Sequence, residues 1–145
     1  MKINIYDPKF INTKNKKNMN FYEWPSRIDE ADFLVITCSL NNDNYHMINK
    51  DIFDMIKSGL RIVNVARGQL IDEKSLVSAL KDKRVYSAAL DVFETEPLPL
   101  DSYLRNHPRC IFGSHNASNT KDAVLKTSII ALKKILSFIK DKENE

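Results

Sequence analysis

The sequence predicts an α/β fold in which helices flank a mostly parallel sheet, and three observations lead to this expectation. Short apolar runs that end in polar residues alternate along the chain with segments of helical periodicity. The connections between successive runs are too long for hairpins, as parallel pairing requires. The apolar runs in the middle of the chain are nearly continuous, which is typical of strands buried on both faces.

The composition is that of a globular protein with one domain. The chain has 145 residues, of which 43% are hydrophobic and 28% are charged, enough for a sizeable core. The net charge of +3 is small, and most of the excess falls in the polar run of residues 14–17. Because no basic patch with interleaved aromatic residues accompanies this run, we expect no nucleic-acid partner.

We expect neither a membrane span nor a secretory signal, and therefore a cytoplasmic protein. The longest apolar run is well short of the ~18 residues that a span needs, and a charged residue and a strand-like pattern directly follow Met1. Cys38 and Cys110 lie in or beside apolar strand-like runs. They are interpreted as buried thiols in a reducing compartment, with no disulfide and no metal site.

Several segments have the pattern of strands. Residues 2–6 alternate apolar and polar side chains and are followed by Asp7 and Pro8, which favour a turn. A second short strand is expected to lead into a helical turn that opens at Pro25. The predicted strands are residues 2–6, 20–24, 33–38, 60–66, 85–90 and 110–112.

Helical periodicity marks three further segments. The first helix begins at Asn49 or at the residues just after it and ends at Gly59, and Asp72 is the expected N-cap of the second. A long third helix is predicted at about residues 119–140, capped by Asn119 or Thr120, with a charged tail that frays. Its apolar residues form one continuous stripe, so we expect it to bury a broad face. The apolar positions of the stripe are Leu125, Ile129, Leu132, Leu136 and Ile139, widened by Val124, Ala131, Ile135 and Phe138.

The stretch of residues 88–99 carries acids directly after an apolar run. Asp91 follows the run, Glu94 and Glu96 come next, and Pro97 and Pro99 forbid a regular helix or central strand beyond them. The acids are therefore expected on a loop at the carboxyl end of a strand, the edge of an open α/β sheet where ligands bind. The simpler interpretation is an ordinary strand followed by an acidic surface loop.

Polar side chains follow the other predicted strands in the same way. Because the carboxyl ends of parallel strands lie at one edge of a sheet, these groups are expected to gather there. They are Asp7, Cys38-Ser39, Arg67-Gly68, Asp91 and Ser114-His115. Taken singly, an arginine at such a place is usually a surface ion-pair partner and a histidine is usually a polar loop residue.

Together, Arg67, Glu96 and His115 suit one definite chemistry, hydride transfer to a 2-oxo acid. Arginine can bind the substrate carboxylate with a planar, bidentate fork and polarise the carbonyl group. Histidine can donate the proton that the developing alkoxide needs. A glutamate hydrogen-bonded to the other imidazole nitrogen would orient the ring.

Three segments resemble a known family. Residues 64–72, residues 89–99 and residues 113–115 are similar to the arginine, glutamate and histidine segments of the D-isomer-specific 2-hydroxyacid dehydrogenases, and residues 31–49 also follow that family's pattern. The group includes glycerate, D-lactate, formate and 3-phosphoglycerate dehydrogenases. The resemblance covers nearly the whole chain and implies a Rossmann-like, NAD-binding fold.

The resemblance also implies roles for individual residues. Arg67 would bind a small 2-hydroxy or 2-oxo acid, His115 would be the general acid and base, and Glu96, rather than Glu94, would pair with His115. Asp7 would accept hydrogen bonds from the adenosine ribose and so favour NAD over NADP. The remaining residues expected along the cofactor are Ser39, Asn44, Val65, Ala66 and Asp91, and no metal is expected.

The chain also departs from the family pattern. With three glycines in all, it contains no G-x-G-x-x-G turn, and its start resembles the second strand of the nucleotide fold. Residues 1–145 are therefore interpreted as a partial NAD-binding domain that lacks the first strand, the glycine-rich turn and a substrate domain. Strand 2–6 would lack its inner neighbour. Ser39, Ser58 and Ser114 stand where the family commonly has proline.

Three hypotheses follow from these features. The chain is a dehydrogenase polypeptide or fragment that needs the missing segment for activity, a non-catalytic NAD-responsive binding module, or an inactive remnant of such an enzyme. The intact Arg67, Glu96 and His115 favour the first. Because backbone amides at a helix N-terminus normally bind the pyrophosphate, we expect the chain alone to be inactive. We expect a homodimer or a partner chain that supplies the missing part.

Overall fold

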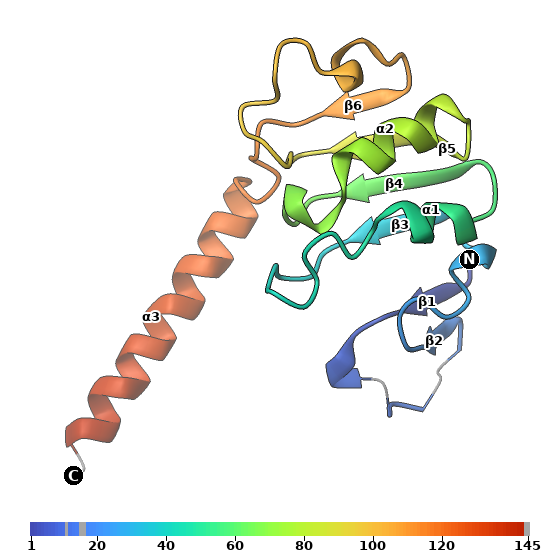
Figure 1. Ribbon diagram of the computed structural model, residues 1–145. Helices are drawn as coiled ribbons and strands as arrows, with labels where there is room; N and C mark the ends of the chain where they lie inside the picture. Colours follow the sequence, from blue (N-terminus) through green and yellow to red (C-terminus); the bar gives the residue numbers. More distant parts are fainter. Residues whose placement is uncertain (11, 15–16, 144–145) are drawn as a thin grey trace.

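The computed structural model describes residues 1–10, 12–14 and 17–143, and it confirms the predicted α/β fold. Its main sheet has four parallel strands in the order β3-β4-β5-β6. Helices α1 (Lys50–Met55) and α2 (Glu73–Lys81) lie on one face of this sheet (Figure 1). The strands are β3 (Phe33–Ile36), β4 (Leu60–Asn64), β5 (Val85–Leu90) and β6 (Cys110–Phe112).

The first two strands form a separate parallel pair, β1 (Ile3–Ile5) and β2 (Met19–Phe21). They continue the row of strands beyond β3 and point the same way (Figure 1), but β1 is not hydrogen-bonded to β3. The Tyr6 hydroxyl donates to the Ser26 carbonyl oxygen at 2.9 Å, and its ring meets that of Trp24 edge-on. Because the two sheets are not joined by hydrogen bonds, the expectation that strand β1 lacks an inner neighbour is confirmed among the described residues.

The edges of β1 and β3 that face this break carry backbone groups with no ladder partner in the described part of the chain. In β3, the carbonyl oxygens of Asp32 and Ile36 accept bonds from the β4 side, so the backbone groups of the alternate residues Phe33 and Val35 point away from β4. In β1, the bonds to β2 involve Ile3 and Ile5. The N–H and C=O of the residue between them, Asn4, therefore face the opposite side.

The core lies between the main sheet and its two helices. Asp72 accepts the N–H groups of Lys74 and Ser75, so the expected N-cap of α2 is present, and Asn49, the first of the expected starting points of α1, accepts the N–H groups of Asp51 and Ile52 as its N-cap. The spacing of Ile52, Phe53, Met55 and Ile56 predicts one apolar face for α1, but Met55 departs from it because it is half exposed. The largest fully buried side chains are Ile28, Ile48, Leu60, Ile62, Leu70, Leu76, Leu80, Leu104, Val85, Val92 and Asn64.

The opposite face of the main sheet is open. Phe33 and Val35 are exposed and alternate with buried residues along β3, and Tyr86 of β5 and Ile111 of β6 are exposed as well. The Arg61 guanidinium lies over the rings of Phe33 and Tyr86, 5.4 and 4.8 Å from their centroids. Parallel sheets are normally covered on both faces, so this face is a second surface without a packing partner among the described residues.

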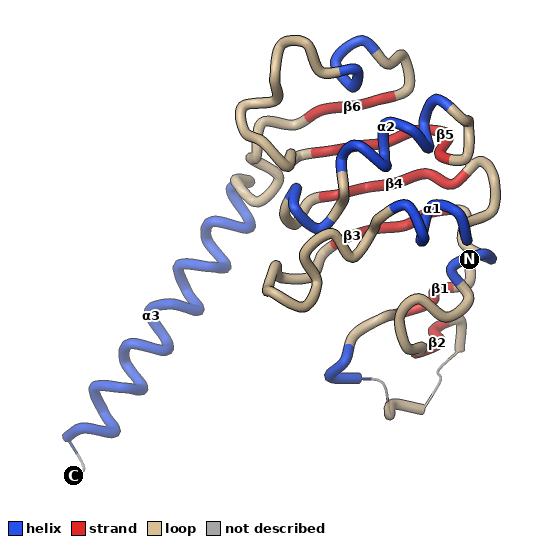
Figure 2. The backbone as a smooth tube through the Cα atoms, in the orientation of Figure 1, coloured by secondary structure: helices blue, strands red, loops and turns tan. Residues whose placement is uncertain are grey.

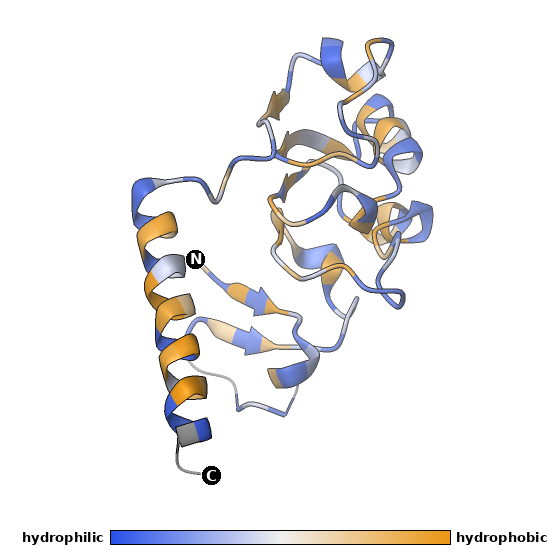
Figure 3. Cartoon of the chain, turned by 90° about the vertical axis from the view of Figure 1, so that its left-hand side faces the viewer, coloured by the Kyte–Doolittle hydropathy of each residue, from blue (hydrophilic) through white to orange (hydrophobic). Residues whose placement is uncertain are grey.

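Helix α3 (Lys121–Glu143) extends away from both sheets (Figures 1 and 2). The prediction that it buries a broad face is wrong, because only Ala123 among its described side chains is not exposed. The apolar stripe itself is present and runs along the helix (Figure 3). Periodicity fixed which side of the helix is apolar, but no described surface of this chain packs against that side.

The helix begins after Thr120, whose hydroxyl accepts the Ala123 N–H, and continues past the expected end at residue 140.

The cysteine prediction is also only partly right. Both thiols are free, Cys110 is partly buried, and Cys38 is exposed. Partial desolvation of the sulfur and, secondarily, the nearby carboxylate of Asp7 raise the pKa of Cys38. Within the part of the chain that the structure describes, no helix is both long and apolar enough to cross a membrane.

Replacing Asp72 by alanine should lower the free energy of unfolding by about 1 kcal/mol, because the first turn of α2 loses the carboxylate that accepts its N–H groups. Denaturant unfolding measures this loss. The matched control is Asp82→Ala at the other end of the same helix, where a negative charge faces the negative end of the helix dipole. An Asp82→Ala loss as large as that of Asp72→Ala would contradict the capping role.

Candidate active site

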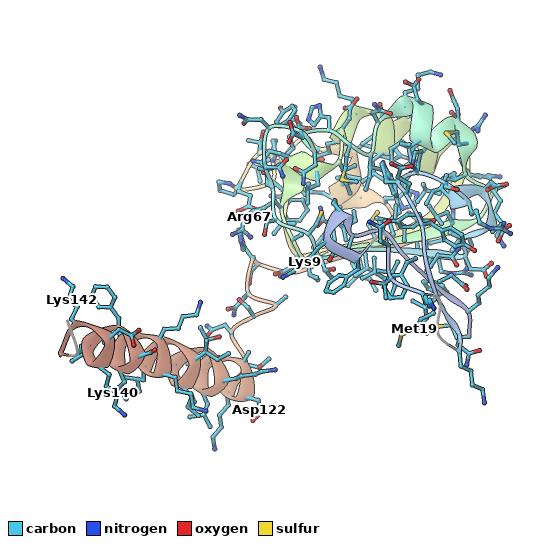
Figure 4. The ribbon with its side chains drawn as sticks, turned by 90° about the horizontal axis from the view of Figure 1, so that it is seen from below. Lys9, Met19, Arg67, Asp122, Lys140 and Lys142 are labelled. Atoms are coloured by element: carbon cyan, nitrogen blue, oxygen red, sulfur yellow. The ribbon has the colours of Figure 1, made fainter. Side chains whose placement is uncertain are left out.

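The loops that follow β4, β5 and β6 meet at one edge of the main sheet, the end from which the chain leaves for α3 (Figure 2). They carry Arg67, Glu96 and His115. Arg67 projects outward at this end of the molecule (Figure 4). Since all four strands are parallel, their carboxyl ends and these three side chains share that edge.

Glu96 and His115 form a hydrogen-bonded pair. His115 Nδ1 lies 2.8 Å from Glu96 Oε2, and the other carboxylate oxygen accepts the backbone N–H of Phe93 at 3.0 Å. The bond with His115, then that from Phe93, and more weakly the charges of His115 and Arg67 lower the pKa of Glu96. The carboxylate is therefore ionised near neutral pH, and the side chains expected to pair are in contact.

Arg67 is placed by a buried amide at the end of β4. Asn64 is 1% exposed. Its Nδ2 donates to the Arg67 carbonyl oxygen at 2.9 Å, and its Oδ1 accepts the Ala66 N–H at 3.0 Å. The Arg67 side chain is exposed and donates one bond to the Ala66 carbonyl oxygen. No role for Asn64 was expected from the sequence, although a polar residue within an apolar run indicates a buried hydrogen-bonding group.

The arginine and glutamate loops touch backbone to backbone at Gly68. A Cβ atom placed on Gly68 would lie 1.9 Å from both the carbonyl carbon and the carbonyl oxygen of Phe93, and 2.4 Å from the nitrogen of Glu94. No side chain fits there without moving one of the two loops. The absence of a side chain at this position therefore fixes how closely Arg67 approaches the segment that carries Glu96.

Asp91 holds the histidine loop. Its backbone oxygen accepts the His115 N–H at 2.8 Å, and its carboxylate oxygens accept the N–H groups of Asn116 and Ala117 at 3.1 and 2.8 Å. Partial desolvation opposes ionisation, but these N–H groups outweigh it and lower the pKa of Asp91. A Cβ on Gly113 would lie 2.0 Å from the same carboxylate. Within this loop, the backbone of His115 is in the left-handed region, with a φ of 58°.

A pocket of about 320 Å³ opens beside the Glu96–His115 pair. Its walls include the apolar side chains of Leu98 and Phe112, and Arg105 lines it as well, whereas Arg67 does not. The Arg105 guanidinium donates to the carbonyl oxygens of Pro99 and Leu98. Sequence reasoning missed Arg105, because nothing in its local pattern showed that the chain turns back to this edge.

The residues expected along a cofactor are spread over the same edge. Asp7 follows β1, and its Oδ1 accepts the Lys9 N–H at 2.9 Å. In the loop after β3, Asn44 Nδ2 donates to the Ser39 carbonyl oxygen at 2.7 Å, and its Oδ1 accepts the Asn41 N–H. Val65, just past β4, is exposed, while Ala66 beside it is buried. The Asn44 amide thus holds its own loop in place, as the Asp91 carboxylate holds the histidine loop.

Among the described residues, no group of three or more His, Cys, Asp or Glu side chains could hold a metal ion.

The sequence and the fold are similar to those of known proteins. Residues 1–117 match the family model described as D-isomer specific 2-hydroxyacid dehydrogenase, NAD binding domain. The chain is 34% identical over 141 residues to D-3-phosphoglycerate dehydrogenase of Bacillus subtilis (strain 168), a match that covers 97% of this chain and 27% of that protein. It is 36% identical over 109 residues to glyoxylate/hydroxypyruvate reductase B of Enterobacter agglomerans, covering 75% of this chain and 34% of that protein.

Solved structures share the fold. A glyoxylate reductase from Paecilomyes thermophila superposes with a TM-score of 0.74 at 32% identity, covering 83% of this chain and 36% of that one. An NAD-dependent formate dehydrogenase from Staphylococcus aureus in complex with NAD gives 0.68 at 28% identity, covering 77% and 33%. D-2-hydroxyisocaproate dehydrogenase gives 0.83 at 24% identity, covering 97% and 46%, a likeness of fold alone. The chain spans only 27% and 34% of the two curated relatives named above.

The free energy of unfolding should fall at acid pH in a way that depends on Glu96. Since the folded-state pKa of Glu96 is lowered, its stabilising contribution is present above the ordinary glutamate pKa and is lost as the pH falls through the folded-state value. Urea unfolding of the wild type and of Glu96→Gln, from about pH 7 to about pH 3, measures this. The Glu96→Gln variant should be less stable at neutral pH, and its free energy of unfolding should fall less steeply as the pH is lowered.

The control is Glu23→Gln, which changes an exposed glutamate elsewhere and should keep the wild-type dependence of stability on pH. If Glu96→Gln also kept that dependence, the pairing of Glu96 with His115 would be contradicted.

Replacing Gly68 by alanine should destabilise the protein by about 3 kcal/mol or more, because the new methyl group meets the Phe93–Glu94 backbone. The matched control is Gly59→Ala. Gly59 has a φ of 93° but open space around the missing side chain, so only the backbone strain of roughly 1–2 kcal/mol is expected there. Thermal unfolding compares the two, and equal losses would show that Gly68 is not at a close backbone contact.

Proposed function

Because the chain belongs to the D-isomer specific 2-hydroxyacid dehydrogenase family through its NAD binding domain, we propose that it carries the catalytic residues of an oxidoreductase. The reaction is hydride transfer between NAD(H) and a small 2-hydroxy or 2-oxo acid. The observation that carries this proposal is the Glu96–His115 hydrogen bond on loops next to the one that holds Arg67. The names of the relatives, glyoxylate/hydroxypyruvate reductase B among them, fit the same substrate class.

Each of the three side chains has a separate task in this proposal. The Arg67 guanidinium binds the substrate carboxylate and places the neighbouring carbonyl group. His115 Nδ1 is bonded to Glu96, which leaves Nε2 to give a proton to the carbonyl oxygen in reduction and to take it from the hydroxyl group in oxidation. Glu96 fixes the tautomer and the orientation of the ring. The nicotinamide of bound NAD(H) supplies or accepts the hydride.

The described residues fit the ends of NAD better than its middle. Asp7 offers a carboxylate for the adenosine ribose, and exposed Val65 offers an apolar contact near Arg67. No glycine-rich turn is available for the pyrophosphate, since Gly59 forms a turn before β4 while Gly68 and Gly113 lie against Phe93 and Asp91. In this proposal, the turn that binds the pyrophosphate comes from another segment of polypeptide.

The break between β1 and β3 supports a place for that segment. The backbone groups of Asn4 on one side, and of Phe33 and Val35 on the other, face it and have no ladder partner among the residues that the structure describes. We propose that a strand running parallel to β1 and β3 pairs with both edges and leads into the glycine-rich turn. The open sheet face and the apolar stripe of α3 offer further surfaces for the same polypeptide or for a second copy of the chain.

The proposal is tested by mixing the chain with NADH and glyoxylate or hydroxypyruvate, alone and with a polypeptide that carries such a strand and turn. Loss of reduced cofactor is followed by absorbance. We expect turnover only in the complemented mixture, reduced about 10²-fold or more in Arg67→Ala and about 10²–10⁴-fold in His115→Gln.

Arg84→Ala serves as the matched control and should retain turnover, because Arg84 precedes β5 at the amino end of the strand and donates to the carbonyl oxygens of Phe53 and Asp54. Turnover that survives His115→Gln would refute the assigned role of the imidazole. Cofactor binding without turnover in the complemented wild type would instead support a non-catalytic NAD-responsive module.

A further inference from the structure

A second imidazole–carboxylate pair lies two residues before Glu96 on the same loop. His46 Nε2 is 2.8 Å from Glu94 Oε1, and both side chains are about three-quarters buried, with exposures of 29% and 28%. The loop of residues 93–96 is thus bonded to an imidazole on each side, through Glu94 to His46 and through Glu96 to His115. Neither the sequence pattern nor the proposed chemistry gives His46 or Glu94 a task.

The remaining oxygen of Glu94 is bonded to the start of α2. Glu94 Oε2 accepts the Glu73 N–H at 3.1 Å, and in return the Glu94 N–H donates to Glu73 Oε2 at 3.4 Å. The first N–H groups of a helix have no partner within it, so an external carboxylate there is favourable. Burial and the neighbouring charge of Glu94 raise the pKa of Glu73, although the N–H of Glu94 opposes them. The two carboxylates tolerate their proximity because each accepts an N–H from the other's backbone.

The backbone of Glu94 completes the link to the arginine loop. Its carbonyl oxygen accepts Gln69 Nε2 at 3.2 Å, and the Gln69 carbonyl oxygen accepts the His46 N–H at 2.8 Å. The close approach of Gly68 to Phe93 lies directly beside these bonds. Glu94 therefore joins the loop after β3, the turn after Arg67 and the start of α2 to the loop after β5.

We propose that Glu94 is the positioning residue of the candidate active site. The N–H of Phe93 donates to Glu96 Oε1, so this hydrogen bond closes residues 93–96 into a turn and ties the position of Glu96 to that of Glu94. When His46 and Glu73 hold Glu94, the turn presents Glu96 to His115 on one side and keeps it within the electrostatic influence of Arg67 on the other. Glu94 touches no substrate and acts only through Glu96.

This role of Glu94 rests on the proposed pairing of Glu96 with His115. The experiment therefore measures the titration of Glu96, which reports on that pairing, and not turnover. Carboxyl-carbon NMR of the full chain follows the titration of Glu96 without any cofactor. If the wild-type titration of Glu96 is not displaced to low pH, the Glu96–His115 pair itself fails, and the proposed function loses its support before any variant is compared. If it is displaced, the variants test Glu94.

In Glu94→Ala we expect the pKa of Glu96 to rise toward its ordinary value, because the bonds from His115 and Phe93 that lower it loosen. Glu94→Gln should give a smaller rise, since an amide oxygen still accepts the Glu73 N–H. His46→Gln, which leaves the start of α2 intact and so protects the test against misfolding, should shift Glu96 in the same direction.

Asp72→Ala provides the matched control for stability. This substitution removes another hydrogen-bond acceptor from the first turn of α2. The Asp72 side chain is not hydrogen-bonded to residues 93–96. This variant should unfold more easily while the pKa of Glu96 stays low. The inference is overturned if Glu94→Ala and His46→Gln reduce stability as Asp72→Ala does and leave the Glu96 titration where it is in the wild type.

Discussion

The candidate active site depends on two places where neighbouring loops approach each other closely at a glycine. At Gly68 the arginine loop lies against the carbonyl group of Phe93, and at Gly113 the histidine loop lies against Asp91. A side chain at Gly68 would separate the two loops, and one at Gly113 would displace the Asp91 carboxylate that accepts the N–H groups of Asn116 and Ala117. Because backbone segments are far less free to move than long side chains, the contact at Gly68 fixes the arginine loop against the glutamate loop more firmly than an ion pair could. The histidine loop is held by its hydrogen bonds with Asp91.

The carboxylates around these contacts are held by N–H groups rather than by exposed cations. Asp91 accepts the N–H groups of Asn116 and Ala117, Glu96 accepts that of Phe93, and Glu94 accepts that of Glu73. Each bond joins one loop to another or closes a turn. The groups therefore have their orientation before any ligand arrives, which is the arrangement that favours catalysis by fixed dipoles and charges.

Away from this site, the chain leaves several surfaces uncovered. The facing edges of β1 and β3 have unpaired backbone groups, the outer face of the main sheet exposes Phe33, Val35 and Ile111, and the apolar stripe of α3 touches no described part of the chain. The helix-covered side of the sheet, by contrast, is well packed. This division agrees with a chain that spans 27% and 34% of the length of two curated relatives.

The order of strands and helices, the cap Asp72, and the three segments that hold Arg67, Glu96 and His115 could all be predicted from the amino-acid pattern. These features follow from periodicity, capping chemistry and short motifs, all of which act over a few residues. What each surface of an element meets could be seen only in the folded chain. The tertiary structure left α3 unpacked and Cys38 exposed, directed the Asp91 carboxylate to the histidine loop, and brought His46 to Glu94 across 48 positions of the chain. Such contacts depend on which distant segment lies opposite, and the local pattern of a single chain carries no record of that.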